Sequence, residues 1–403
     1  MLVAHRIALD PNIKQVDYFK RASGTARFAY NWALTEWNAQ YRNGDRPSEA
    51  ALRRQLNAIK RQQFPWMTEV SKSVIQAAII NLGDAWSRFF KGLKKAKAKV
   101  NRPKLKKKGK RDSFYAGTFP DLAIDGKRIR LPVIGWVRTR EALRFSGKIR
   151  SATVSRDADR WFVSVLVDAN IDDNCPKDEH DFIGIDLGIK TMAECSDGRK
   201  FHAPKPLKRM LKALRRLNRR LHRRKIGGKN RAKTREKLAR LHYRIKCVRQ
   251  DCLHKGTSTI AKTKRFVVLE DLNVAGMLKL RSNARSISDI GFYEFRRQLE
   301  YKSKLYGCEV IIADRFFPSS KRCSECGVIN PVERTDEWTC MACGVVHQRD
   351  ENAAKNLKWY GKSRRKNLEF STDSSSGSYA CGEIGSGCRA IGSETSLTET
   401  GTQ

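Results

Sequence analysis

The chain has 403 residues, with 82 Lys and Arg against 42 Asp and Glu, and its formal net charge at pH 7 is +40. This length suffices for about two to four domains, and a hydrophobic content of 40% suffices for packed cores. Such a charge repels itself unless a polyanion neutralises it, so nucleic acid is the expected partner and an anionic membrane surface the weaker alternative. The sequence lacks an apolar run of the roughly 18 residues that a membrane-spanning helix needs, and its first residues do not resemble a secretory signal. We therefore expect a cytosolic protein whose 11 cysteines are mostly reduced thiols or metal ligands.

The N-terminal part combines a strand, a helical region and a β-rich region. Residues 1–10 alternate like one short strand, and residues 11–112 carry apolar residues at helical spacing. Residues 113–172 contain the β-rich runs KRIRLPVIGWVRTR and IRSATVSRDADRWFVSVLVDA, with a candidate turn at DADR. This order favours a small β-barrel formed by 1–10 and 113–172, with the helical region inserted. Residues 91–111 contain twelve Lys or Arg and no acid, and we expect them to follow phosphates in a complex.

The following part begins with an expected linker at 173–180 and ends with an expected disordered, Ser/Gly/Thr-rich tail at 371–403. The segments DFIGIDLG, KRFVVLEDL and CEVIIADRFF predict buried strands, SDGRK predicts a hairpin turn, and ISDIGFYEFRRQLEYKSKLYG predicts one helix. Residues 205–250 contain twenty Lys or Arg and one acid, Glu236, with leucines at helical spacing on both sides of GGKN. A solvated coiled coil would mix both signs of charge, so we interpret residues 205–255 as a helical hairpin with a nucleic-acid face.

Four cysteines have a spacing that is typical of metal sites: Cys323, Cys326, Cys340 and Cys343 read C-x2-C-x13-C-x2-C. Four thiolates favour a tetrahedral structural Zn²⁺, and the alternatives are a redox pair or chance. Because four cysteines fill the coordination shell, we expect His347 to be a surface or nucleic-acid-facing histidine. A closed shell also predicts that this zinc is not catalytic.

Three acids stand at positions that favour a shared site. Asp186 ends the strand in IGIDLG, Glu270 ends the strand in FVVLED, and Asp350 begins a helix in QRDENAAKN. Any one of them has a simpler explanation, since strand ends meet solvent. Their order along the chain, however, is the layout of an RNase H-like nuclease, in which the two strands are neighbours. Two Mg²⁺ ions about 3.5–4 Å apart can drive phosphodiester hydrolysis, and carboxylates are the ligands that hold such hard cations.

At this point the chain resembles the TnpB (OrfB-like) family, which bacterial insertion sequences encode and which is related to the type V CRISPR effector nucleases. The matching segments lie between residues 26 and 357: ARFAYNWAL, GIDLGIK, VRQDCLHK, VLEDLNVAGM, SISDIGFYEFRRQLEYKSKLYG, FFPSSKRCSECG, TCMACG and RDENAAKNL. The resemblance implies an α/β multi-domain fold. It would contain an RNase H-like (RuvC) nuclease domain at 173–319 and 345–370, an inserted four-Cys zinc ribbon at 320–344, and a β-barrel (wedge) domain at 1–10 and 113–172 that carries a helical recognition domain at 11–112.

The resemblance also implies a function. Family members are RNA-guided DNA endonucleases that bind a noncoding guide RNA, recognise a short motif beside a double-stranded DNA target, and cut both strands by two-metal-ion catalysis. Carried over to this chain, Asp186, Glu270 and Asp350 bind two catalytic Mg²⁺ ions, and the four cysteines bind structural Zn²⁺. We expect one monomer per RNA, in the bacterial cytosol or nucleoid, and no membrane partner. Two alternatives stay open, a regulator of transposition that binds RNA or DNA without cutting and an unguided nuclease.

Two sets of residues are expected to contact nucleic acid. Lys72 and Gln76 match polar positions on a family helix that faces the target-adjacent motif, and their spacing of four places them on one helix face. An ordinary solvated face is the alternative. On the basic hairpin, the expected RNA contacts are Arg215, Arg216, Arg219, Arg220, Arg223 and Arg224.

Overall fold

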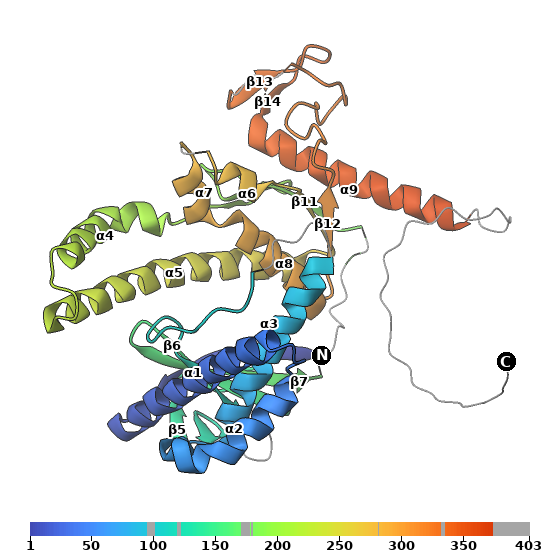
Figure 1. Ribbon diagram of the computed structural model, residues 1–403. Coiled ribbons are helices and arrows are strands. Elements are labelled where there is room, and N and C mark those ends of the chain that lie inside the picture. Colours follow the sequence, from blue (N-terminus) through green and yellow to red (C-terminus); the bar gives the residue numbers. More distant parts are fainter. Residues whose placement is uncertain are drawn as a thin grey trace, which may run out of the picture.

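The computed structural model describes residues 1–94, 101–118, 122–170, 178, 180–280, 282–331 and 335–373 (Figure 1). The N-terminal strand β1 lies inside a seven-stranded antiparallel sheet, between β7 and β5. Its burial alternates, with every second side chain facing the core, as expected for a half-buried strand. The described pairings leave β2 and β3 as edges, so closure into a barrel stays a prediction. The strands are β1 (Leu2–Asp10), β2 (Ser113–Gly117), β3 (Ala123–Asp125), β4 (Arg128–Leu131), β5 (Gly135–Thr139), β6 (Gly147–Asp157) and β7 (Arg160–Ala169).

A set of helices follows β1 in the chain and packs on this sheet. Asn12 and Gln15 form a capping box at the start of α1, which fixes where the helix begins. The rings of Trp37 and Trp86 stack at 5.5 Å between α1 and α3, and Phe19 joins α1 to the sheet. The insertion of helices between β1 and β2 is as predicted. The helices are α1 (Ile13–Arg42), α2 (Glu49–Gln63), the short 3-10 helix η1 (Pro65–Glu69) and α3 (Lys72–Lys94).

The basic segment after α3 differs from the prediction of helix up to residue 112. Residues 101–112 are not helical and run along α1, where the side chain of Asn31 exchanges hydrogen bonds with the backbone of Lys106 at 2.8 and 3.0 Å. The ammonium group of Lys106 lies 3.8 Å from the centroid of the Tyr30 ring, a cation–π contact, and burial lowers its pKa. At least this lysine therefore supports the fold, although the residue as a whole remains exposed.

The second sheet has five strands in the order β10-β9-β8-β11-β12. Strands β8, β11 and β12 are parallel, and β9 and β10 form the antiparallel hairpin predicted at SDGRK. Ile185 pairs with Leu269, so the next residues, Asp186 and Glu270, end neighbouring strands at the same level. The strands are β8 (Phe182–Asp186), β9 (Ala193–Cys195), β10 (Lys200–Phe201), β11 (Phe266–Glu270) and β12 (Glu309–Ala313).

The helix α9 (Arg349–Asp373) lies directly on β8 and β11. Two glycines permit this close approach, one on each side of the contact. A Cβ atom on Gly184 would lie 2.0 Å from the carbonyl oxygen of Ala354, and one on Gly361 would lie 2.4 Å from Val268. The backbone of α9 therefore rests on the sheet without intervening side chains at these points.

The other helices of this part include the predicted basic hairpin, α4 (Pro206–His222) and α5 (Lys229–Thr263), which extends away from the second sheet in Figure 1. The prediction of one helix over 287–307 is wrong. Gly291, with φ of 85°, separates α7 (Ala284–Ile290) from α8 (Phe292–Tyr306). A short helix, α6 (Val274–Met277), follows β11.

Residues 314–348, between β12 and α9, carry the four cysteines and are called the cysteine knob here. Figure 1 shows it at the N-terminal end of α9. Its hairpin, β13 (Glu337–Thr339) and β14 (Val346–Gln348), extends past the predicted boundary at 344. Helix α9 likewise runs three residues into the predicted tail, whereas residues 374–403 and most of the predicted linker at 173–180 lie outside the described residues. None of the helices in the described part of the chain is both long and apolar enough to span a membrane.

Candidate functional site

The three acids predicted to form a site lie where the neighbouring strands β8 and β11 end, here called the carboxyl edge of the second sheet. Asp186 and Glu270 end neighbouring parallel strands, and Asp350 is the second residue of α9, which packs across β8. Burial, followed by the charges of Glu270 and Asp350, raises the pKa of Asp186 well above its ordinary value. A Cβ atom on Gly188, two residues after Asp186, would lie 3.7 Å from the Asp350 carboxylate. The fold thus brings together acids that are 84 and 80 residues apart in sequence (186 to 270, 270 to 350).

A fourth acid, Glu194, belongs to the same edge and was missed from the sequence. It pairs across strands with Asp186, only 5% of it is exposed, and its charge contributes to the raised pKa values of Asp186 and Asp350. Lys200 on β10 forms an ion pair with Glu194 at 2.6 Å. The hydrogen bond to Glu194, with smaller effects of Glu351 and Asp350, raises the pKa of Lys200. The SDGRK turn was the signal that could have led to Glu194, because the hairpin that it closes pairs β9 with β10 and places Lys200 opposite Glu194.

The second acid, Glu270, differs from its neighbour Asp271. The buried hydroxyl of Ser319 donates a hydrogen bond to the Glu270 carboxylate. Asp271 instead forms ion pairs with Arg296 at 2.9 Å and Arg315 at 2.5 Å, which lower its pKa, Arg296 contributing most. Of the two adjacent acids in VLEDL, only Glu270 is therefore left to face the site.

A cavity of about 320 Å³ opens beside Glu270. It lies between the end of β11 and α8, with Arg296 and Arg315 among its lining residues. Tyr293 also lines it and is 68% exposed. The cavity thus combines cationic groups with an accessible aromatic ring directly next to a carboxylate.

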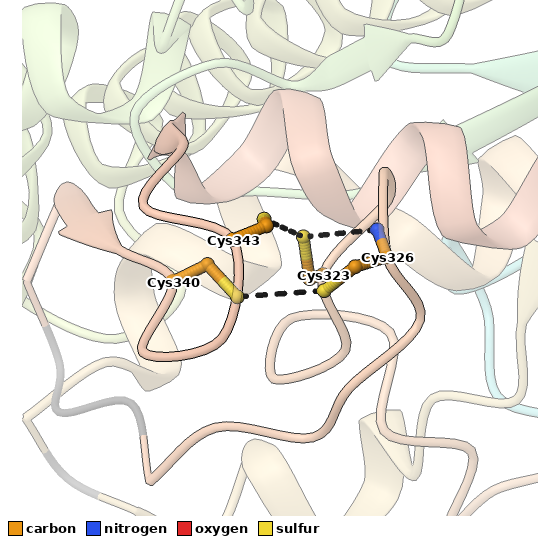
Figure 2. Close-up of side chains that lie close together, drawn as sticks. All are labelled: Cys323, Cys326, Cys340 and Cys343. Carbon is orange, nitrogen blue, oxygen red and sulfur yellow. Dashed lines mark hydrogen bonds between the residues drawn. The ribbon is translucent and has the colours of Figure 1, made fainter.

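The four cysteines of the knob converge, as Figure 2 shows. Their sulfur atoms all lie within 4.8 Å of one another, with 3.7 Å between Cys323 and Cys343 and 3.6 Å between Cys326 and Cys340. In the part of the chain that the structure describes, the carboxylates do not form a group as tight as this. Backbone N–H groups, that of Cys343 foremost, lower the pKa of Cys340 to about 6, which favours the thiolate that binds metal.

His347 is buried, so the expectation of a surface or nucleic-acid-facing histidine is wrong. Only 6% of it is exposed, its Nε2 atom lies 3.0 Å from the sulfur of Cys323, and its ring packs on Trp338 with centroids 4.8 Å apart. The cause is strand geometry, because His347 is the inward-facing middle residue of β14. His347 supports a cysteine sulfur rather than facing a partner.

The residues expected to contact nucleic acid are placed away from the acids. Lys72, the first residue of α3, is exposed, and Gln76, one turn later, is half-buried. Arg224 differs from the other five arginines predicted to contact RNA, because it donates hydrogen bonds to Asn230 and Thr234 at the start of α5. The exposed arginines of this set are Arg215, Arg216, Arg219, Arg220 and Arg223, and a surface hollow is lined by Arg216, Arg219, Arg220, Arg223 and Arg224.

Family models match three parts of the chain. A model described as "Probable transposase" matches residues 164–281, and one described as "Cas12f1-like, TNB domain" matches residues 292–357, which include the cysteines and Asp350. A third, described as "Helix-turn-helix domain", matches residues 1–46. In this structure that last segment contains the strand β1 and the single long helix α1.

Individual relatives match over most of their length. A protein of Streptomyces pristinaespiralis is 35% identical over 359 residues, which cover 86% of this chain and 86% of the relative. A protein of Mycobacterium tuberculosis (strain ATCC 25618 / H37Rv) is 33% identical over 397 residues, covering 89% and 86%. Both carry the name "Putative RNA-guided DNA endonuclease".

A solved structure supports the fold. The Cas12f1–sgRNA–target DNA complex superimposes with a TM-score of 0.51 at 16% identity, covering 86% of this chain and 83% of that chain. The mixed α/β architecture is therefore shared with a known protein. Because its relatives match at this level over most of both chains, this chain belongs to the TnpB (OrfB-like) family.

Proposed function

We propose that this protein is an RNA-guided DNA endonuclease that binds a transposon-derived guide RNA and hydrolyses both strands of a matched DNA target. The observation that carries the proposal is the meeting of Asp186, Glu270 and Asp350 at one sheet edge, in a chain whose relatives are named for this activity. The net charge of +40 supports polyanionic partners. A regulator that does not cut would have no use for a convergence of carboxylates that repel one another.

The carboxylates suit two Mg²⁺ ions, which when bound would activate a water molecule and stabilise the leaving oxygen. The charges of both other acids act on Asp186, which would therefore contribute to both ion positions. The raised pKa of its carboxyl fits this role, because a carboxylate surrounded by negative charge gains most from neighbouring cations. Glu194 adds negative charge at the same edge, and Lys200 compensates part of it.

The four cysteines suit a structural Zn²⁺, because four sulfur atoms at this separation can close a tetrahedral shell. On this reading the second sheet with α9 is the RuvC-like nuclease domain and the cysteine knob is its zinc ribbon. The seven-stranded sheet would be the wedge domain, and α1–α3 would form the inserted recognition domain. In that recognition domain, exposed Lys72 and half-buried Gln76 would face the target-adjacent motif.

The nucleic acids would be held by groups outside the carboxylate site. The exposed arginines of α4 would bind guide RNA phosphates, leaving sequence reading to base pairing. The cavity beside Glu270 would receive the unpaired strand, with Tyr293 offering a ring on which a base can stack and arginines facing its phosphates. Arg224 would act within the hairpin, holding α4 against α5.

A cleavage assay on co-purified complex tests the proposal. The gene is expressed with its native downstream flank, RNA that purifies with the protein is sequenced, and the complex is given Mg²⁺ and a plasmid with the guide-matched target beside a randomised flank. Guide-dependent double-strand cuts with an enriched flank motif are expected. Target binding without cuts would favour the alternative, a nuclease-independent RNA- or DNA-binding regulator of transposition. Cutting without RNA would favour an unguided nuclease.

A further inference from the structure

One hydrogen-bonded chain connects the cysteine knob to the carboxylate site through Ser319. Its hydroxyl donates to the Glu270 carboxylate, and its carbonyl oxygen accepts from the side-chain amide of Asn356 at 2.8 Å. Ser319 is 5% exposed and Asn356 is 0% exposed, so the contact between them is buried and the contact with half-buried Glu270 is partly buried. Hydrogen bonds to a charged group in such surroundings are stronger than those in solvent.

The same helix holds the first cysteine turn. Asn356 donates to the carbonyl oxygen of Arg322 at 2.5 Å and accepts from its guanidinium at 2.8 Å. Asn352, one helical turn earlier and 1% exposed, accepts from the backbone N–H of Ser324 at 2.9 Å and donates to the Arg322 carbonyl at 2.8 Å. Because Arg322 and Ser324 flank Cys323, the two asparagines fasten the backbone on both sides of this cysteine to α9.

We propose that Ser319 is a positioning residue that fixes the orientation of the Glu270 carboxylate from the cysteine knob. The proposal rests on the proposed function, because it concerns the cation site that Glu270 would share. Glu270 is the last residue of β11, and its side chain has torsions that the strand does not fix. A donor on the rigid knob supplies the missing constraint. Asp350 lies two residues before Asn352 on α9, so one framework places both Glu270 and Asp350.

The consequence is a link between the two metal sites. Partners that orient a metal-binding side chain typically contribute 10–100-fold to metal affinity or activity. Removing the Ser319 hydroxyl should therefore weaken divalent-cation binding by about tenfold or more, while the cysteine cluster stays intact. Binding of guide RNA and recognition of the DNA target should be unchanged, because they would rest on the arginines of α4 and on base pairing rather than on Ser319.

The test compares Ser319→Ala with Ser319→Thr and with Ser320→Ala. Ser319→Thr keeps the hydroxyl, and Ser320 is a half-buried serine next to it that takes no part in the hydrogen bonds above. Binding of Mn²⁺, a stand-in for Mg²⁺, is measured by the electron paramagnetic resonance of free Mn²⁺ on the full-length, zinc-loaded protein freed of RNA. The Mg²⁺ midpoint of cleavage is measured in parallel on the RNA complex. The expected result is about tenfold weaker Mn²⁺ binding and a higher Mg²⁺ midpoint for Ser319→Ala alone.

The outcomes separate the two proposals. Equal Mn²⁺ affinity in Ser319→Ala and the unaltered protein overturns the positioning role, as does equal weakening in the Thr variant. If the Ala variant fails to fold, Asn356→Asp serves instead, since it keeps the size and the contact with the Arg322 guanidinium but removes the donor to the carbonyl oxygens of Ser319 and Arg322. Unaltered Mn²⁺ affinity in that variant overturns the role too. If the unaltered protein neither binds Mn²⁺ nor cuts, the proposed function itself fails.

Discussion

The cysteine cluster and the carboxylate site are built in opposite ways. The cysteines come from one short segment and their sulfur atoms lie within 4.8 Å of one another, so the cluster is closed and locally specified. The acids come from two strands and a helix far apart in sequence, and burial, followed by the charges of the other two acids, raises the pKa of Asp186. A closed site supports structure, whereas an open, electrostatically unfavourable site is suited to binding ions and substrate.

The largest effect should come from removing the open site. Asp186→Ala deletes the carboxylate on which the charges of both other acids act. We expect cleavage to fall to background while RNA-dependent DNA binding persists, because guide RNA would be bound by the arginines of α4 and the target by base pairing. Gel-shift and plasmid-cleavage assays on the same complex check this. Loss of binding together with cleavage would mean that Asp186 is a structural residue.

The next effect should come from opening the closed site. Cys323→Ser removes one of the two buried cysteines of the cluster, and with it the sulfur atom that His347 contacts. We expect loss of zinc, a lower melting temperature and cleavage reduced by about 10–100-fold, because the knob orients Glu270 and Asp350. Cys247→Ser, at an exposed cysteine on α5, is the matched control. A folded Cys323→Ser protein that cuts at full rate would separate the cluster from catalysis.

A third change would loosen the packing between α9 and β8 without altering a predicted metal-binding residue. Gly184→Ala places a Cβ atom 2.0 Å from the carbonyl oxygen of Ala354, so α9 must move away from β8. We expect a loss of about 1–3 kcal/mol or more in the free energy of unfolding, with reduced cleavage. Denaturant unfolding measures this. Gly24→Ala is the control, because that helical glycine has an ordinary contact at 3.8 Å, and a comparable loss there would contradict the packing argument.

The smallest effect concerns stability and pH. The raised pKa of Asp186, caused first by burial, means that the metal-free folded chain keeps a proton that the unfolded chain has already lost. Stability should therefore fall as pH rises from the ordinary Asp pKa through the raised value. Asp186→Asn should remove this fall, so it should melt higher than the unaltered protein at neutral pH and equally at low pH. Differential scanning calorimetry without divalent cations checks the sign, and a lower melting point of Asp186→Asn at neutral pH would contradict it.

The sequence predicted those features that rest on local spacing or on long apolar runs. The cysteine turns, the strands ending in Asp186 and Glu270 and the basic hairpin belong to this class. Glu194 and His347 were misjudged because each lies in a strand of three residues, where alternation is too short to show which face is buried. The same limit applies to Ser319, whose partner Glu270 is 49 residues away.

The predicted helix boundaries were wrong for a different reason. The apolar spacing continues across residues 284–306, and only the left-handed conformation of Gly291 reveals the break. The lysine-rich stretch after α3 read as helix, but Asn31 and Tyr30 hold part of it in an extended path that depends on tertiary contacts. Neither contact is visible in the order of residues.

The close seating of α9 has a mechanical consequence. Gly184 and Gly361 lie in close contact with their neighbours, and Asn352 and Asn356 hold the cysteine knob. The side of the carboxylate site formed by α9 and the knob is therefore packed too closely to shift. Widening the entrance for a nucleic-acid strand must then fall to the opposite side, where α6 lines the cavity and has none of its four residues buried. The side formed by α9 and the cysteine knob would then stay fixed, and the side formed by α6 would move.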